Sequence, residues 1–259
     1  MSILTVKNLT KAFGGLIANS DITMDVKKGS ITAVIGPNGA GKTTFFNMVT
    51  GVYQPTSGDI QLNGQSIVGL KPHSVSTKGI SRTFQNIRLF GSMTVLENVM
   101  VGMHNHIKQG VLGAVLDLPS FKKQERFAEQ EAYNILDYIG LSQFTNEEAR
   151  NLSYGAQRRL EIGRALATRP QVLLLDEPAA GMNPKETKEL TELIFNMRNE
   201  FGLTIVLIEH DMKLVMEISE HIVVLDHGVK IAEGTAEEIR KNQKVIEAYL
   251  GKSASESVT

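Results

Sequence analysis

The sequence predicts an α/β fold: a parallel sheet that carries a glycine-rich loop, an antiparallel β subdomain beside it, and an inserted helical subdomain. Three short, continuously apolar segments have the length and composition of strands buried on both faces of a parallel sheet. They are residues 31–35, 172–175 and 204–208. The glycine-rich loop follows the first segment directly, and 134 residues separate its Lys42 from Asp176, which follows the second. One crossover connection needs far fewer residues, so a whole subdomain is expected in between.

The antiparallel β subdomain is predicted at residues 3–35 and 58–68, where short β-rich runs alternate with turn residues. The turn signals are Lys28-Gly29, Thr56-Ser57-Gly58 and Asn63-Gly64. Runs of this length joined by such turns favour antiparallel pairing, so we expect these strands to lie beside the parallel sheet.

The glycine-rich loop reads GPNGAGKTT at residues 36–44 and has the pattern of a phosphate-binding loop. Glycine reaches backbone angles closed to other residues, so successive amides can point at phosphate oxygens. A helix beginning near Gly41 would add its positive dipole end. Lys42 is expected to reach the β- and γ-phosphates of ATP, and the Thr43 hydroxyl to bind Mg²⁺. The expected nucleotide contacts are Gly36, Pro37, Asn38, Gly39, Ala40, Gly41, Lys42, Thr43 and Thr44.

Helical patterns fill the predicted insertion. Thr94 and Glu97 have the spacing of a capping box, which predicts the start of a helix. Apolar residues between 127 and 139 recur at spacings of three and four, and Gly140 follows them as a stop signal. We therefore expect the insertion to be helical.

A second loop with an anion-binding pattern stands at residues 152–157, which read LSYGAQ. The run that follows has helical periodicity, so Ser153 falls at or near an N-cap. A serine hydroxyl and the amide of Gly155 at a helix start would form a second anion site. Taken alone, a serine at this position is more often only a helix cap.

Two further polar groups follow predicted strands. Asp176 and Glu177 end the run 172–175, at the edge of a parallel sheet where ligands bind. Asp176 is expected to hold Mg²⁺, and Glu177 to activate water as a general base; a solvated acidic turn is the alternative. His210 follows the run 204–208 and would lie beside the γ-phosphate, unless it is a structural histidine.

Composition sets limits on the function. With 259 residues and 42% hydrophobic content, the chain can bury a sizeable core. A net charge of −1 argues against nucleic acid as a partner, and the lack of cysteine excludes a disulfide framework. We expect no signal peptide and no membrane span, because no apolar stretch approaches 18 residues.

Together these motifs resemble the ATP-binding subunits of ABC transporters, over residues 2–251. The resemblance also rests on Gln85 in RTFQN and on the AAGMN turn at 179–183. It implies that Gln85 contacts Mg²⁺ and water, and that Phe13 stacks on adenine; a core position explains Phe13 nearly as well. The implied organisation is one domain over 1–251, with a nucleotide core at 1–84 and 160–251, a helical subdomain at 85–159 and a disordered polar tail at 252–259.

The resemblance further implies a head-to-tail dimer with a second ATPase chain, identical or different. Ser153 and Gly155 of one chain would then face, in trans, the γ-phosphate held by Lys42 of the other. Two residues depart from the family pattern in the signature: Tyr154 and Ala156 stand where Gly and Gln are common. Asn183 in the next turn stands where Asp is common, and it would keep hydrogen bonding across the dimer while removing a charge. These departures bear on whether the two ATP sites of the dimer, each formed by residues of both chains, are equally active.

Within the family, segments such as 82–102 and the ending IEAYLG are similar to the ATPase of branched-chain amino acid importers. This implies membrane-spanning permease subunits as partners and a peripheral place on the cytoplasmic face of the cell membrane. Leu89 and Phe90 are candidates to receive a permease helix, although core packing explains them equally well.

Three other classes of nucleotide-binding protein are alternatives to an importer ATPase. A lipopolysaccharide-exporter ATPase shares the motifs but has a shorter insertion. A soluble DNA-maintenance ATPase would carry sustained heptads, which the insertion lacks. A non-hydrolysing binder would be expected to lose Glu177 or Lys42, and both are present.

Overall fold

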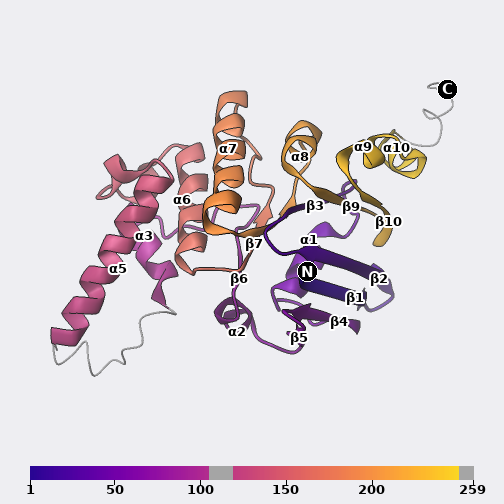
Figure 1. Cartoon of the computed structure of the whole chain (residues 1–259), viewed down its shortest axis with the longest axis horizontal. Coiled ribbons are helices and arrows are strands. Elements are labelled where there is room, and N and C mark those ends of the chain that lie inside the picture. The colour runs from indigo at the N-terminus through magenta and orange to yellow at the C-terminus, as the bar shows by residue number, and fades with distance from the viewer. Residues whose placement is uncertain (105–118, 251–259) are drawn as a thin grey trace.

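The computed structural model describes residues 1–104 and 119–250, with the side chains of 119–124 and 250 left aside. The predicted polar tail at 252–259 lies outside this range. Strands and helices form two lobes, a core lobe built on two sheets and a lobe of helices at the other end of the molecule (Figure 1).

The first sheet of the core lobe has six strands in the order β10-β9-β3-β8-β7-β6. Their bounds are β3 Ile31–Ile35, β6 Ile80–Arg82, β7 Val172–Asp176, β8 Thr204–Ile208, β9 His221–Asp226 and β10 Val229–Gly234. All neighbours are parallel except β10, which pairs with β9 in antiparallel fashion. The three predicted strands are β3, β7 and β8, and every residue in them is buried. The parallel core is therefore confirmed.

The second sheet is antiparallel, in the order β2-β1-β4-β5. Its strands are β1 Ser2–Phe13, β2 Leu16–Lys27, β4 Ser57–Leu62 and β5 Gln65–Ser66. One predicted turn is wrong, because Ser57 and Gly58 belong to β4. Gly58 has φ +93°, and a Cβ there would lie 2.4 Å from the carbonyl oxygen of Asn8. This glycine lets β4 pass close to β1 rather than turn away from it.

Helices cover the parallel sheet, and this sheet separates two apolar cores. The core lobe carries α1 Lys42–Val49, α2 Pro72–Thr77, α7 Pro184–Phe201, α8 Met212–Ile218, α9 Ala236–Arg240 and α10 Gln243–Leu250. Along β3, Val34 packs with α1 and the antiparallel sheet, whereas Ala33 and Ile35 pack with α7, α8 and the helical lobe. Both faces of β3 are thus covered, as its unbroken apolar run predicts.

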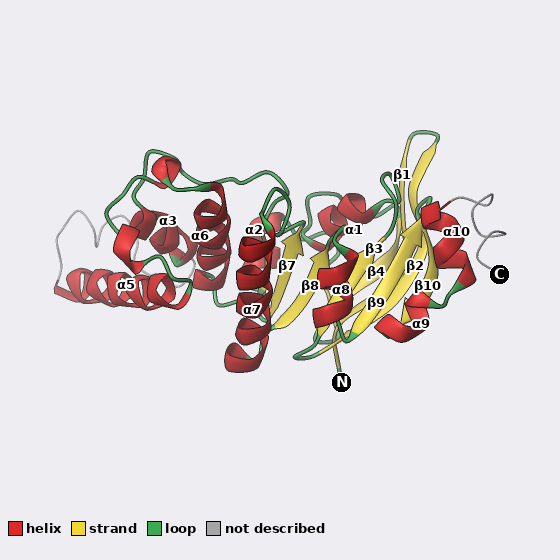
Figure 2. Ribbon diagram, turned by 90° about the horizontal axis from the view of Figure 1, so that it is seen from above, coloured by secondary structure: helices red, strands yellow, loops and turns green. Residues whose placement is uncertain are grey.

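The helical lobe consists of α3 Val95–Gly102, α5 Pro119–Tyr138 and α6 Tyr154–Ala167, and in Figure 2 it lies on the far side of α7 from the strands. The predicted capping box of Thr94 and Glu97 begins α3. Residue Gly140, at φ +70°, follows α5. Phe127 lies off the buried stripe of α5, with 58% of its surface exposed. The predicted boundary between the helical subdomain and the nucleotide core, at residues 159 and 160, falls inside α6. The assignment of residue ranges to the two subdomains stays a prediction.

Within the described ranges, no helix is long and apolar enough to cross a bilayer.

Candidate nucleotide site

The glycine-rich loop joins the end of β3 to α1, which begins at Lys42. A Cβ on Gly36 would lie 2.0 Å from the carbonyl oxygen of Leu225, and one on Gly41 would lie 2.5 Å from that of Ala18. Only glycine fits where the backbones of neighbouring strands approach this closely. No side chain caps the start of α1, so its first amides and its positive dipole end are available to an anion.

The Lys42 side chain is folded into this loop. Its Nζ donates to the carbonyl oxygens of Gly36 at 2.7 Å and Pro37 at 2.9 Å. Burial lowers the pKa of Lys42, while the nearby carboxylates of Glu177 and Asp176 act in the opposite direction. The Lys42 ammonium therefore lies near the carboxylates of Asp176, the last residue of β7, and of Glu177, which follows it.

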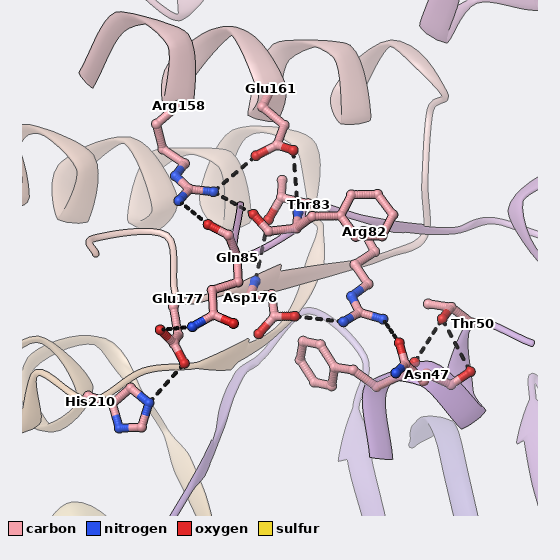
Figure 3. A network of polar contacts seen from close by, with 12 residues as sticks. Asn47, Thr50, Arg82, Thr83, Gln85, Arg158, Glu161, Asp176, Glu177 and His210 are labelled. Atoms are coloured by element: carbon pink, nitrogen blue, oxygen red, sulfur yellow. Dashed lines mark hydrogen bonds and ion pairs between the residues drawn. The ribbon is translucent and has the colours of Figure 1, made fainter. Parts of the chain in front are cut away.

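Glu177 joins two side chains that lie far apart in the sequence, as Figure 3 shows. Its Oε2 accepts a hydrogen bond from Nε2 of Gln85 at 2.9 Å, and its Oε1 lies 2.8 Å from Nε2 of His210. Glu177 has φ +49°, an uncommon conformation for a residue with a side chain, and such conformations concentrate at functional sites. The structure thus brings three of the predicted catalytic residues into one cluster. Lys42 lies close enough for the Glu177 carboxylate to raise its pKa against the effect of burial.

Asp176 lies beside this cluster at the end of β7 and is 2% exposed. Its Oδ2 pairs with Nη2 of Arg82 at 2.6 Å, and Nη1 of the same arginine donates to Oδ1 of Asn47 at 2.7 Å. Oδ1 of Asp176 is buried and has no hydrogen-bond partner among the described residues. A buried oxygen of this kind, with the exposed Thr43 in the first turn of α1, fits the oxygen ligands that Mg²⁺ prefers.

Sequence reasoning missed Glu209, which links His210 to the segment after Glu177. Its Oε1 accepts from the backbone N–H of Ala179 at 2.7 Å, and its Oε2 from that of His210 at 2.9 Å. Burial raises the pKa of Glu209. An acidic residue directly after the apolar run 204–208 was the available signal.

The predicted signature lies in the helical lobe, at the start of α6. Ser153 is the N-cap, as predicted, and its Oγ accepts from the amide of Ala156 at 3.4 Å. The serine is exposed, whereas Gly155 is buried. A Cβ on Gly155 would lie 2.9 Å from Oε1 of Glu186. The signature helix therefore packs closely against the start of α7.

Asn183 caps that helix and forms a capping box with Glu186. Its side chain accepts from the amides of Lys185 and Glu186, both at 3.0 Å. An aspartate would make the same cap with a negative charge. Hydrogen bonding by Asn183 across a dimer stays a prediction.

Phe13 ends β1 and does not lie in the core, since 43% of it is exposed. Its ring meets Tyr53 edge-on at 5.2 Å, and Nζ of Lys11 lies 4.9 Å from its centre. The core interpretation of Phe13 is therefore wrong. Its contact with adenine stays a prediction.

A groove of about 430 Å³ lies between the two lobes. Its aromatic and cationic lining comes from Arg82, Phe84, Arg88, Phe90 and Arg164. Phe90 is 48% exposed, and the Arg164 guanidinium lies 5.7 Å from its ring. Leu89 packs instead against the core of the helical lobe. Of the two candidate docking residues, Phe90 is available to a partner and Leu89 serves core packing.

Comparisons with known proteins agree with this geometry. The ABC transporter family matches residues 19–180, and a family described as branched-chain amino acid ATP-binding cassette transporter matches residues 229–255. A curated relative is the high-affinity branched-chain amino acid transport ATP-binding protein BraF of Pseudomonas aeruginosa. It is 51% identical over 97% of this chain and 98% of its own length.

Solved structures show the same fold. The crystal structure of a nucleotide-free ATP-binding cassette from an ABC transporter superposes with a TM-score of 0.84 and 34% identity, covering 97% of this chain and all of that one. A dimeric cassette in a post-hydrolysis state, bound to ADP and Pi, superposes with a TM-score of 0.76 and 25% identity, covering 90% of this chain and 98% of that one. The chain belongs to the ABC transporter family, as one of its ATP-binding cassettes.

Proposed function

We propose that this chain hydrolyses ATP to power a branched-chain amino acid importer, as a subunit bound to the cytoplasmic face of the membrane. The observation that carries the proposal is the cluster of Gln85, Glu177 and His210 within reach of the charge on Lys42. Phosphates would lie on the loop 36–44 and the adenine beside Phe13.

Each side chain of the cluster has a distinct role in the proposed hydrolysis of ATP. Glu177 orients the attacking water and takes its proton, because its carboxylate ends a buried strand beside the phosphate loop. Gln85 and His210 each bond one oxygen of this carboxylate and so fix its direction. Lys42 binds the β- and γ-phosphates. Mg²⁺, held by Thr43, Asp176 and Gln85, would neutralise charge on the same phosphates.

A second chain would complete each site. Ser153 is exposed at the start of α6, in the helical lobe, whereas α1 and its loop belong to the core lobe (Figure 1). The dimer of the similar cassette supports association of two such chains. In a head-to-tail dimer, Ser153 and Gly155 would bind the γ-phosphate at the partner's loop.

The groove between the lobes is the proposed seat of the permease. Its exposed Phe90 and the guanidinium groups of Arg88 and Arg164 suit a short helix that carries apolar residues and a carboxylate. Because the groove borders the segment of Gln85, a permease helix seated there would lie close to the hydrolytic cluster.

The transported substrate is supported by the name of the relative and by the second family match, at residues 229–255. The test is uptake of radiolabelled leucine into vesicles that hold the chain with its own permease subunits and internal ATP. We expect uptake with the parent chain and with Lys28→Ala, which alters an exposed lysine, and none with Lys42→Ala. Uptake that persists with Lys42→Ala would contradict the proposal. ATP hydrolysis without any leucine uptake would refute the substrate and favour another ABC system.

A further inference from the structure

Arg158 and Glu161 form an ion pair that is fully buried in the helical lobe. Arg158 is 0% exposed and Glu161 1% exposed, and their charged groups meet at 3.0 Å, one turn apart on α6. Burial raises the pKa of Glu161, and Arg158 opposes that shift. Apolar residues commonly replace such pairs without loss of stability. The position of the pair therefore calls for a role other than stability.

Both partners also bind the backbone of the segment that contains Gln85 (Figure 3). Arg158 donates through Nη1 to the carbonyl oxygen of Phe84 at 2.6 Å, and through Nη2 to that of Gln85 at 2.8 Å. Oε1 of Glu161 accepts from the amides of Phe84 at 3.4 Å and Arg88 at 3.2 Å. The pair thus satisfies donors and acceptors of the segment 84–88 together, and fixes that segment against α6.

Tyr154 makes a further contact with the same guanidinium, which donates through Nη2 to the tyrosine hydroxyl at 3.2 Å. The tyrosine ring lies against Gly181, since a Cβ there would be 3.2 Å from Cε1 of the ring. Gly181 belongs to the turn that follows Glu177. Tyr154, one of the two residues that depart from the common signature pattern, therefore lies between Arg158 and this turn.

From these contacts we infer that Arg158 is a positioning residue that couples the signature helix to Gln85 and, through the Gln85 amide, to Glu177. A shift of α6 moves the guanidinium and hence the Gln85 backbone, which changes the hydrogen bond of Gln85 to Glu177. The inference rests on the proposed function. In a head-to-tail dimer one chain supplies Gln85 to its own ATP and Ser153 to the other ATP, so Arg158 links the two sites.

A double-mutant cycle tests the coupling. Arg158→Lys keeps the charge beside Glu161 but removes the fork that reaches two carbonyl oxygens. We expect this change to lower kcat about 10-fold and to alter the KM for ATP less than about twofold, because it disturbs orientation rather than binding. In a Gln85→Ala background, the same change should lower kcat by less than about twofold, since the group through which it acts is gone.

The matched control is Arg169→Lys, which alters the exposed pair with Glu131 just after α6 and should leave kcat unchanged. Tyr154→Phe removes only the hydroxyl contact, so we expect kcat to fall about twofold to threefold. Equal losses from Arg158→Lys with and without Gln85 would overturn the inference, as would a lower melting temperature with unchanged kcat.

The experiment also separates a failure of the coupling from a failure of the proposed function. If Arg158→Lys does not fold, the joint variant Arg158→Gln with Glu161→Gln, which removes both charges, takes its place in the same cycle. A parent chain that does not hydrolyse ATP at all would refute the proposed function. An active parent with additive losses would refute the coupling alone.

Discussion

The two lobes present their functional groups in different ways. In the core lobe, Glu177 and His210 follow buried parallel strands and contact each other through side chains. In the helical lobe, Ser153 is exposed at the start of α6 and its hydroxyl caps its own helix. The core lobe holds Glu177 in contact with Gln85 and His210, whereas Ser153 of the signature is exposed.

In the proposed function a chain binds ATP through its core lobe and needs the signature of a second chain, and this difference agrees with both requirements. A rigid sheet fixes the groups that act on the phosphates, because its strands are buried on both faces. The helical lobe is fixed to that cluster through polar contacts of Arg158 and Glu161. Movement of the helical lobe would change the cluster without disturbing the sheet. The predictions below test the core lobe from its largest expected effect to its smallest.

The largest effect is expected at Glu177. Glu177→Gln keeps the size of the side chain but removes the base, so turnover should fall by about 10² or more. ATP binding should remain, since Lys42 and the loop are intact. Turnover measured with coupled phosphate release, together with binding of a fluorescent ATP analogue, checks both statements. Turnover near the parent level would remove Glu177 from this role.

A smaller effect is expected at His210, which orients Glu177 and is 41% exposed in its side chain. His210→Ala should slow hydrolysis about 10-fold, less than the roughly 10²-fold or more expected for the base itself, because His210 only orients that base. It should leave the melting temperature within a few degrees of the parent, because the ring fills no core position. Unchanged turnover with a large fall in melting temperature would favour a structural histidine.

The smallest effect concerns stability at Lys42. A lysine whose pKa is lowered by folding contributes stability above its ordinary pKa of 10.5 and loses it as the pH falls through the lowered value. At pH 7.5 the buried charge therefore destabilises the fold. We expect Lys42→Met to raise the melting temperature by a few degrees at pH 7.5, and this gain to shrink as the pH rises towards the ordinary lysine pKa of 10.5.

Calorimetry at pH 7.5 and at pH values rising towards 10.5 checks this prediction, with Lys28→Met as the exposed control. A lower melting temperature for Lys42→Met at pH 7.5 would show that its bonds to the loop carbonyls outweigh the burial of its charge. ATP affinity should fall in the same variant, because a charge aimed at the phosphates is gone.

Much of the core lobe could be predicted because its signals are local. Unbroken apolar runs identified β3, β7 and β8, and the glycine-rich loop and Glu177 directly follow β3 and β7. The capping residues Thr94 and Ser153 were equally readable, since a cap depends on a few neighbouring residues.

Contacts between residues far apart in the sequence could not be predicted, whether within the core lobe or at the helical lobe. Arg82 pairs with Asp176 across 94 positions, and Arg158 binds the carbonyl oxygen of Gln85 across 73. In sequence, Arg158 is one of several charged residues on a helix, and nothing local marks it as buried. The turn predicted at Gly58 failed for the same reason, since the strand that it approaches lies at Asn8.

The central claim is that the core lobe of one chain works with the signature of another. The direct measurement mixes two inactive variants, Ser153→Arg and Lys42→Ala, and records ATP hydrolysis against their ratio. A mixed dimer holds one intact composite site, so equal amounts should recover up to about a quarter of the parent rate, while Lys42→Ala alone recovers none. No recovery at any ratio, with a parent chain that is fully active where sedimentation shows a monomer, would contradict the account.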